Sequence, residues 1–417
     1  MTECPPMNPT SNALCRESTG TMVLDGLGSF ASDRHQRVVQ TWIVEQGTPD
    51  PLSVIETMIE SYPKDEDTTQ SGWFMMLSYE LGRVIEPKAQ HIDSQTGSDP
   101  TGFPLAVIQR WETCIDHEPV HPGEYAIGQI KSSMGKSEYI AAVRRVQAYI
   151  RQGDVYQANI AHHLRGSFSG NARSCFDAIS KAASPRLGSL MVFDHHGARH
   201  AIASVSPEVF ITCELNDRTI RTEPMKGTRP VGADENELRD STKDRAELDM
   251  ITDLMRNDLG RVCVLGSVHV VDQRKIESHR SGVLQASSVI EGNLAQGVGI
   301  GEVIKATFPP GSVTGAPKVR AMQIIDEIEQ ADRDSYCGAM LVMTDAGKIE
   351  ASVSIRTAHI WGEIVADDTE SVQNGQFVYP VGAGIVADSD PESEWAETLV
   401  KARILETSLG IDLPDEV

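Results

Sequence analysis

The sequence predicts an α+β fold in which helices pack outside antiparallel sheets. Two observations lead to this class: short apolar runs come in pairs around tight turns, and helix-periodic stretches separate those pairs. Parallel βαβ winding fits this order less well, because a parallel strand pair needs a long crossover connection rather than a tight turn.

Three segments have the pattern of β-hairpins. Each has an apolar, strand-forming run on either side of residues that favour a chain reversal. They are 189–205 around His195-His196-Gly197, 208–223 around Asn216-Asp217, and 339–357 around Asp345-Ala346-Gly347.

Four stretches are expected to be helices. In the first, at about 137–152, Tyr139, Val143 and Val146 recur at helical spacing, and Gly153 ends the helix. The other three lie at about 243–259, 317–330 and 391–409.

The chain divides into a tail and two parts. Residues 1–20 are expected to be a disordered tail, and the stretch 117–125 is rich in Pro and Gly, which suggests a boundary. The boundary separates a smaller N-terminal part, 21–125, from a larger part, 135–410.

Composition excludes several classes of protein. The 417 residues include 60 acidic and 37 basic side chains, a net charge of −23, so nucleic-acid binding is not expected. No apolar run of membrane-spanning length and no secretory signal are present. Seven scattered cysteines without a CxxC pair suggest reduced thiols, and therefore a cytoplasmic protein.

Two of the expected helices carry carboxylates on one face. Asp244 and Glu247 are three residues apart, and Glu394, Glu397 and Lys401 share a face of the last helix. Each helix taken alone is explained by acids that the helix dipole favours in a first turn. Together the two helices are also suited to Mg²⁺, which prefers oxygen ligands and retains several waters.

Eight segments in a fixed order resemble the chorismate-utilising enzymes, the family of anthranilate, aminodeoxychorismate, isochorismate and salicylate synthases. Segment 72–87 further resembles the N-terminal part of the aminating members. The resemblance implies two stacked antiparallel β-sheets flanked by helices, with the site between them. The eight segments are GDVYQANI, SPEVF, EPMKGTRP, AELDMITDLMRNDLGR, FPPGSVTGAPKVRAMQIIDE, YCGAMLVM, SIRTA and VGAGIVADSDPESEWAETLVKA, within about 135–410.

The resemblance also implies a magnesium ion that binds the ring carboxylate of chorismate. Glu247 and Glu397 would be its direct ligands, and Asp244 and Glu394 would hold its water molecules. Lys401 would contact the same ring carboxylate.

Further substrate contacts follow from the same motifs. Arg356 and Tyr336 match the residues that hold the enolpyruvyl carboxylate, for which an arginine fork is suited. The alternation of Val353, Ile355 and Thr357 predicts a strand with Arg356 on its opposite face, where it could also be a plain exposed residue.

Glycines and polar side chains complete the implied contacts. Gly382 and Gly384 would let backbone N–H groups approach the substrate, and Thr314 would be a polar contact at a helix start. Gln285 stands where the family generally has a histidine; glutamine can donate a hydrogen bond but cannot carry positive charge.

Two positions separate the reactions of the family. Isochorismate and salicylate synthases carry a lysine general base where this chain has Gln157, so water is disfavoured as the nucleophile and ammonia favoured. Aminodeoxychorismate synthases carry a lysine, and anthranilate synthases usually an alanine, where this chain has Lys226. Read without the motif, Lys226 would be a surface lysine in a turn.

The implied reaction is amination of chorismate at C4. Glu208 would protonate the departing hydroxyl while Lys226 adds at C2, and ammonia would then add at C4 and expel Lys226. Apolar neighbours such as Val209 and Phe210 would help to raise the pKa of Glu208. No cysteine lies in a Gly-x-Cys-x-Gly elbow, so ammonia is expected from a partner, a class I glutamine amidotransferase. The alternatives are anthranilate synthase component I and a non-catalytic chorismate-binding relative.

Overall fold

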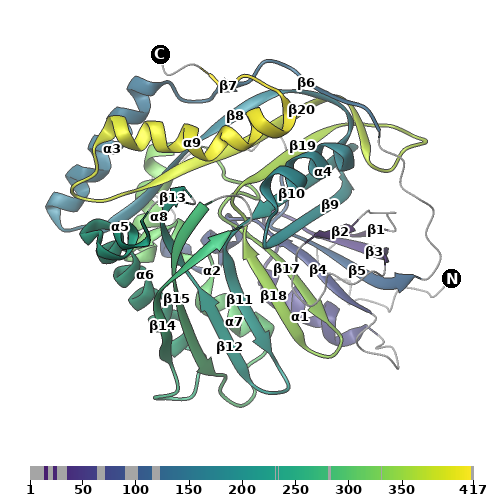
Figure 1. Ribbon diagram of the computed structural model, residues 1–417. Coiled ribbons are helices and arrows are strands. Elements are labelled where there is room, and N and C mark those ends of the chain that lie inside the picture. The colour runs from purple at the N-terminus through teal and green to yellow at the C-terminus, as the bar shows by residue number, and fades with distance from the viewer. Residues whose placement is uncertain are drawn as a thin grey trace.

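Two antiparallel sheets are stacked face to face, with helices on their outer sides (Figure 1). The computed structural model describes residues 14–16, 22–25, 35–62, 71–89, 102–114, 123–230, 232, 234–279, 283–329 and 331–414. Every strand pair in these ranges is antiparallel, which confirms the predicted α+β class.

The first sheet has 11 strands in the described part of the chain, in the order β1-β3-β5-β4-β17-β18-β11-β12-β15-β13, with β14 paired to β15. Strands β4 and β17 are neighbours, so the N-terminal and C-terminal parts of the chain share this sheet. Its strands are β1 (Leu14–Arg16), β3 (His35–Val44), β4 (Ser71–Leu77), β5 (Ala106–Cys114), β11 (Val209–Glu214), β12 (Thr219–Glu223), β13 (Met225–Pro230), β14 (His269–His279), β15 (Val283–Asn293), β17 (Ala339–Thr344) and β18 (Lys348–Val353).

The second sheet has nine strands among the described residues, in the order β16-β8-β20-β19-β10-β9-β2, and the short strands β6 and β7 pair with β8. Its central pair, β8 and β20, runs alongside for most of its length. The strands are β2 (Met22–Asp25), β6 (Tyr125–Ile127), β7 (Lys131–Ser132), β8 (Gln157–Asn171), β9 (Leu187–His195), β10 (Ala198–Ser206), β16 (Gly315–Ala316), β19 (Thr357–Ile364) and β20 (Ser371–Ile385).

The predicted helices form close to their expected bounds. Gly153 ends α3 with a φ of 83°, and the Asp390 side chain caps α9 at Ser393 N. Helices α3, α4, α8 and α9 pack against the second sheet, whereas α6 packs on β15 of the first sheet. The helices are α1 (Pro51–Ser61), α2 (Leu81–Ile85), α3 (Lys136–Gln152), α4 (Ala172–Ala183), α5 (Glu235–Asp240), α6 (Thr242–Gly260), α7 (Ile300–Thr307), α8 (Lys318–Glu329) and α9 (Pro391–Leu409), with 3-10 turns η2 (Pro87–Ala89) and η3 (Gly311–Val313).

Strand β4 shows how the layers are held together. Its alternate residues Phe74 and Met76 belong to a cluster between the sheets that also contains Met191 of β9. Trp73 and Met75 point the other way, into the cluster that includes α1 and α7. Both faces of this strand are therefore buried, which explains its continuous apolar sequence.

Two expectations from the sequence were wrong in detail. Within the expected tail 1–20, Leu14–Arg16 form β1 and pair with β3; the rest of that segment lies outside the described residues. The strand expected to run through residue 357 ends at Val353, and Thr357 begins β19 of the other sheet.

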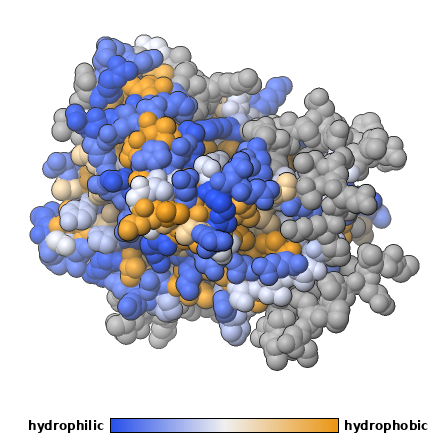
Figure 2. Space-filling model, turned by 90° about the horizontal axis from the view of Figure 1, so that it is seen from below, coloured by the Kyte–Doolittle hydropathy of each residue, from blue (hydrophilic) through white to orange (hydrophobic). Residues whose placement is uncertain are grey.

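The protein surface mixes apolar and polar groups. Viewed from below, orange apolar groups lie between blue polar ones (Figure 2). Among the helices described, none is both long and apolar enough to cross a membrane. Cys175, Cys213, Cys263 and Cys337 are buried free cysteines.

Candidate active site

The site forms where the chain crosses twice between the sheets. Strands β10 and β19 pair in the second sheet, and their continuations β11 and β18 pair in the first (Figure 1). Glu208 lies in one crossing and Arg356 in the other. The crossings are bonded to strands beside them: Val205 N donates to Arg356 O (3.0 Å), and Val353 N donates to Glu208 O (3.1 Å).

This geometry corrects the predicted setting of Arg356. The residue is not on one face of a strand but in the bend between β18 and β19, with a φ of 50°. The alternation of neighbouring apolar residues continues through the bend and therefore does not reveal it. The partly exposed guanidinium lies close to Tyr379 of β20: burial raises the pKa of this tyrosine, and the charge of Arg356 opposes the rise.

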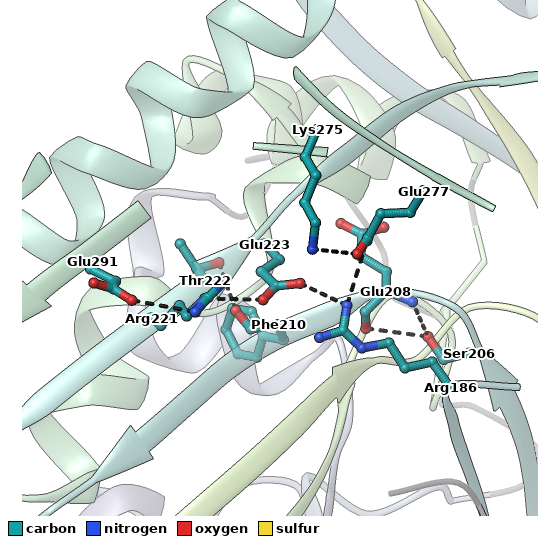
Figure 3. A network of polar contacts seen from close by, with 10 residues as sticks. All are labelled: Arg186, Ser206, Glu208, Phe210, Arg221, Thr222, Glu223, Lys275, Glu277 and Glu291. Carbon is teal, nitrogen blue, oxygen red and sulfur yellow. Dashed lines mark hydrogen bonds and ion pairs between the residues drawn. The ribbon is translucent and has the colours of Figure 1, made fainter. Parts of the chain in front are cut away.

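Glu208 is a buried carboxyl group, 4% exposed. Its backbone is fixed by Ser206, whose Oγ accepts from Glu208 N at 3.2 Å (Figure 3). Burial raises the pKa of Glu208 from 4.5 to about 7, opposed by a hydrogen bond from Ser312 and by the charges of Lys226 and Lys401. Glu208 can therefore hold a proton at a pH where an exposed carboxyl group has lost it.

Lys226 reaches this carboxyl group from β13. Its Nζ donates to Ser312 O at 3.1 Å. The sheet register shifts between Lys226 and Thr228, and the intervening Gly227 has a φ of 73°. Lys226 therefore belongs to an irregular strand with its amine in the site, rather than to a surface turn.

Glycines of β20 make room for polar side chains of β8. A Cβ added at Gly384 would lie 2.3 Å from Gln157 Nε2 and 3.5 Å from Lys226 Nζ. A Cβ added at Gly382 would lie 2.8 Å from Asn159 Oδ1 and 2.9 Å from the Tyr336 hydroxyl. The two glycines therefore leave room for four polar groups, which a side chain at either position would displace.

Some of these polar groups are unpaired. Both amide atoms of Gln157 and the Oδ1 of Asn159 are buried without a hydrogen-bond partner. Buried polar atoms in folded proteins are almost always bonded, so this group of orphans indicates a place where a polar ligand binds.

The second lysine joins the site to α9. Lys401 Nζ donates to Gly382 O at 2.8 Å and pairs with Glu397 Oε1 at 2.8 Å. Glu394, one turn earlier, is 3% exposed. Burial raises the pKa of Tyr139, and the nearby charges of Glu394 and Glu397 add to the rise.

Two of the predicted metal ligands, Asp244 and Glu247, lie on α6. A Cβ added at Gly227 would lie 3.0 Å from Asp244 Cγ, so Asp244 packs against the strand that carries Lys226. Glu247 lies three residues further along α6 and is partly buried. The four predicted metal ligands therefore come from two helices, α6, which packs against the strand of Lys226, and α9, which carries Lys401.

The donor set fits Mg²⁺ with water in its coordination shell. Four carboxylates supply the hard oxygen atoms that this cation prefers. In the part of the chain that the structure describes, no three of these carboxylates bring ligand atoms within 4.8 Å of one another. The described residues therefore show no closed cage of these carboxylates, so a Mg²⁺ held here would need water or substrate oxygens to complete its shell.

Two other predicted substrate contacts, Thr314 and Gln285, lie in a loop and on a strand. Thr314 follows η3 and donates to Pro310 O at 2.7 Å, whereas α8 begins only at Lys318, so Thr314 is not at a helix start. Its carbonyl accepts from Asn159 N at 2.9 Å, which ties it to the site. Gln285 is buried on β15, opposite Thr228 of β13.

Sequence reasoning missed Ser312 and Asn159. Ser312 bonds to Glu208 through its side chain and to Lys226 through its carbonyl. Both residues lie inside motif segments quoted above, GSVTG and QANI, but polar residues at these positions carry no local signal of their role.

Comparison with known proteins gives the same family as the motifs. The chorismate binding enzyme family matches residues 25–407. The chain belongs to this family. Aminodeoxychorismate synthase component 1 of Salmonella typhimurium is 34% identical over 395 residues, which cover 85% of this chain and 82% of the relative.

Other relatives come from a second branch of the family. Anthranilate synthase component 1 3 of Haloarcula marismortui is 33% identical over 351 residues, 79% of this chain and 66% of that protein. The solved structure of anthranilate synthase component I from Streptococcus pneumoniae covers 93% of this chain and 92% of its own, with a TM-score of 0.70 and 21% identity. At that identity the structural similarity establishes the fold, and it confirms the two stacked sheets.

Proposed function

We propose that the chain is component I of aminodeoxychorismate synthase, which aminates chorismate at C4 to give 4-amino-4-deoxychorismate for 4-aminobenzoate and folate synthesis. The observation that carries the proposal is the Lys226 amine, which lies close to the protonatable Glu208 and faces the same glycine as Gln157. The relative from Salmonella typhimurium supports the same reaction.

Glu208 and Lys226 carry out the chemistry. A carboxyl group with a pKa of about 7 can donate its proton to the departing C4 hydroxyl at neutral pH. As that bond breaks and water leaves C4, the nitrogen lone pair of Lys226 adds at C2, the amine gives up a proton, and the two ring double bonds shift toward C4. Ammonia then adds at C4, and the C2–N bond to Lys226 breaks. Gln157 cannot act as a general base, which disfavours attack by water.

The remaining residues bind and orient the substrate. Arg356 and Tyr336 hold the enolpyruvyl carboxylate, and Lys401 contacts the ring carboxylate. Gly382 and Gly384 admit the ring, while Thr314 and Gln285 line the pocket. Glu247 and Glu397 would ligate Mg²⁺, with Asp244 and Glu394 acting through water. When bound, the ion neutralises the ring carboxylate and fixes its position.

Ammonia is supplied by a partner. At neutral pH free ammonia is mostly ammonium, which is not a nucleophile, so direct delivery is needed. The relatives named component 1 support a separate second component, which we propose to be a class I glutamine amidotransferase.

The test is to supply purified protein with chorismate, Mg²⁺ and an ammonium salt, and to identify products by mass and retention. Wild type is expected to form 4-amino-4-deoxychorismate, and Lys226→Ala to lose this activity. Lys348→Ala, a partly exposed lysine at the far end of β18, serves as the matched control and should retain it. Unchanged chorismate or only a hydroxylated product from the wild type would refute the proposal.

The second candidate is anthranilate synthase component I. The observation in its favour is the 33% identity to the Haloarcula marismortui relative. It predicts an aromatic 2-amino product, and full activity of Lys226→Ala with that product would establish it. Binding of chorismate without any product, measured by calorimetry with and without Mg²⁺, would instead indicate a non-catalytic relative.

A further inference from the structure

A second group of charged and metal-binding side chains lies away from the active site. Glu45 directly follows β3 of the first sheet, whereas His195 and His196 form the end of β9 and the turn to β10 in the second. Among the described residues, this is the group in which three possible ligand atoms from His, Cys, Asp or Glu all lie within 4.8 Å of one another. We propose that Glu45, His195 and His196 bind a transition-metal cation of the zinc type.

The distances are close to those of a tetrahedral site. His195 Nε2 lies 3.4 Å from Glu45 Oε2, and His196 Nε2 lies 3.9 Å from the same oxygen. With zinc–ligand bonds of about 2.0–2.1 Å, two ligands of a tetrahedral site are about 3.4 Å apart. The first distance already agrees. The second requires a shift of about half an ångström, which the His196 side chain, 56% exposed, has room to make.

The turn makes this arrangement possible. Consecutive residues of a strand point to opposite faces, so two adjacent histidines would normally diverge. Here the chain reverses at His196 and Gly197, which have φ values of 48° and 81°. As a result, the two imidazole centroids lie 3.9 Å apart and both rings reach Glu45.

The surroundings of His195 favour a cation. Its side chain is 1% exposed, and Nε2 faces two oxygen atoms, Glu45 Oε2 and Gly102 O at 3.1 Å. Both oxygens are acceptors, so this nitrogen lies in a setting of negative and partly negative oxygen atoms. A cation bound to Nε2 would also contact the carboxylate of Glu45. Two imidazoles and one carboxylate suit zinc, whereas Mg²⁺ prefers oxygen alone.

The bound ion would connect the two sheets. Glu45 directly follows β3 of the first sheet, and the histidines belong to the second, so the ion would join segments that are linked here by the contacts of His195 with Glu45 and Gly102. Its expected role is structural, and it does not depend on the reaction proposed for the active site.

The test uses the full chain after treatment with a chelator. Zn²⁺ is titrated by calorimetry in excess Mg²⁺, which occupies sites made of oxygen ligands alone. One Zn²⁺ per chain and a higher melting temperature are expected. His196→Ala and Glu45→Gln should each weaken the affinity by about 10–100-fold or more, since even indirect partners of metal ligands contribute that much. With Co²⁺, the wild type should give the intense visible absorption of four-coordinate cobalt.

The controls separate this site from other positions. His269→Ala removes an exposed histidine whose Nδ1 bonds to Ser267 O in its own segment, and it should leave the isotherm unchanged. The proposal is overturned by an absence of binding in the wild type, or by equal affinity of wild type, His196→Ala and Glu45→Gln. Loss of zinc from Glu397→Gln but not from His196→Ala would place the ion at the active site and would also overturn it.

Discussion

Replacing Glu208 with glutamine should stabilise the protein above neutral pH while abolishing its activity. The folded protein raises the pKa of Glu208 from 4.5 to about 7, so it holds a proton that the unfolded chain releases. The stability that protonated Glu208 contributes is fully present below pH 4.5 and is lost as the pH rises to about 7. Above about pH 7, the native state contains a buried carboxylate at Glu208 that unfolding would expose to water.

The size of the effect follows from the difference between the two pKa values. At about 1.36 kcal/mol per pKa unit, the carboxylate costs about 3 kcal/mol above pH 7. Glutamine has nearly the same shape and does not titrate. Unfolding entropy scales with chain length, at about 2.1 cal/mol/K per residue, so this cost corresponds to about 3–4 °C in melting temperature for a chain of this size.

The assay is thermal unfolding of wild type and Glu208→Gln from about pH 5 to about pH 8. The advantage of the variant should grow between these limits and level off above about pH 7. Glu223→Gln is the matched control: Glu223 is also buried but pairs with Arg186 and Arg221, so its loss should destabilise the protein (Figure 3). A difference between wild type and Glu208→Gln that does not change with pH would refute the reasoning.

Four further outcomes are expected. Gly384→Ala should raise KM for chorismate at least about tenfold in steady-state kinetics with little change in melting temperature, because its Cβ would lie 2.3 Å from Gln157 Nε2. Ser312→Ala removes a hydrogen bond that lowers the pKa of Glu208, so the pH at which kcat/KM falls should move upward. Arg110→Met leaves the buried Asp345 without the guanidinium that binds it at 2.5 Å, and urea unfolding should show a loss of about 3–5 kcal/mol. Removal of divalent ions with a chelator should abolish amination, and Glu397→Gln should raise the Mg²⁺ concentration needed to restore it.

Local patterns in the sequence were sufficient for most of the secondary structure. The hairpin at 189–205 and the helices α3 and α9 form as expected, because their turns, caps and apolar spacing all lie within one segment. The same reasoning failed at Arg356. Residues 348–357 alternate as a continuous strand does, and only pairing with β10 in the other sheet shows that the chain has left the first one.

Motifs supplied the candidate site residues, but not the environment of each side chain. The acid at 208 follows from SPEVF, yet its raised pKa depends on burial at a crossing between two sheets. The role of Ser312 follows only from the folded structure, in which its carbonyl accepts a hydrogen bond from Lys226 Nζ. The Glu45 and His195 pair joins residues 150 positions apart in the chain, which no local pattern reports.

The two lysines would allow Glu208 to serve as the proposed acid and still be tolerated in the free protein. In the free protein, Lys226 and Lys401 both oppose the rise in the pKa of Glu208 and so limit the cost of its burial. Chorismate is a dianion, and in the proposed complex Lys401 contacts its ring carboxylate while Lys226 is used in bond formation. Less positive charge then acts on Glu208, and the negative substrate lies beside it, so the proton is held more firmly than in the free protein. The acid is therefore most fully protonated when the C4 hydroxyl is present to receive its proton.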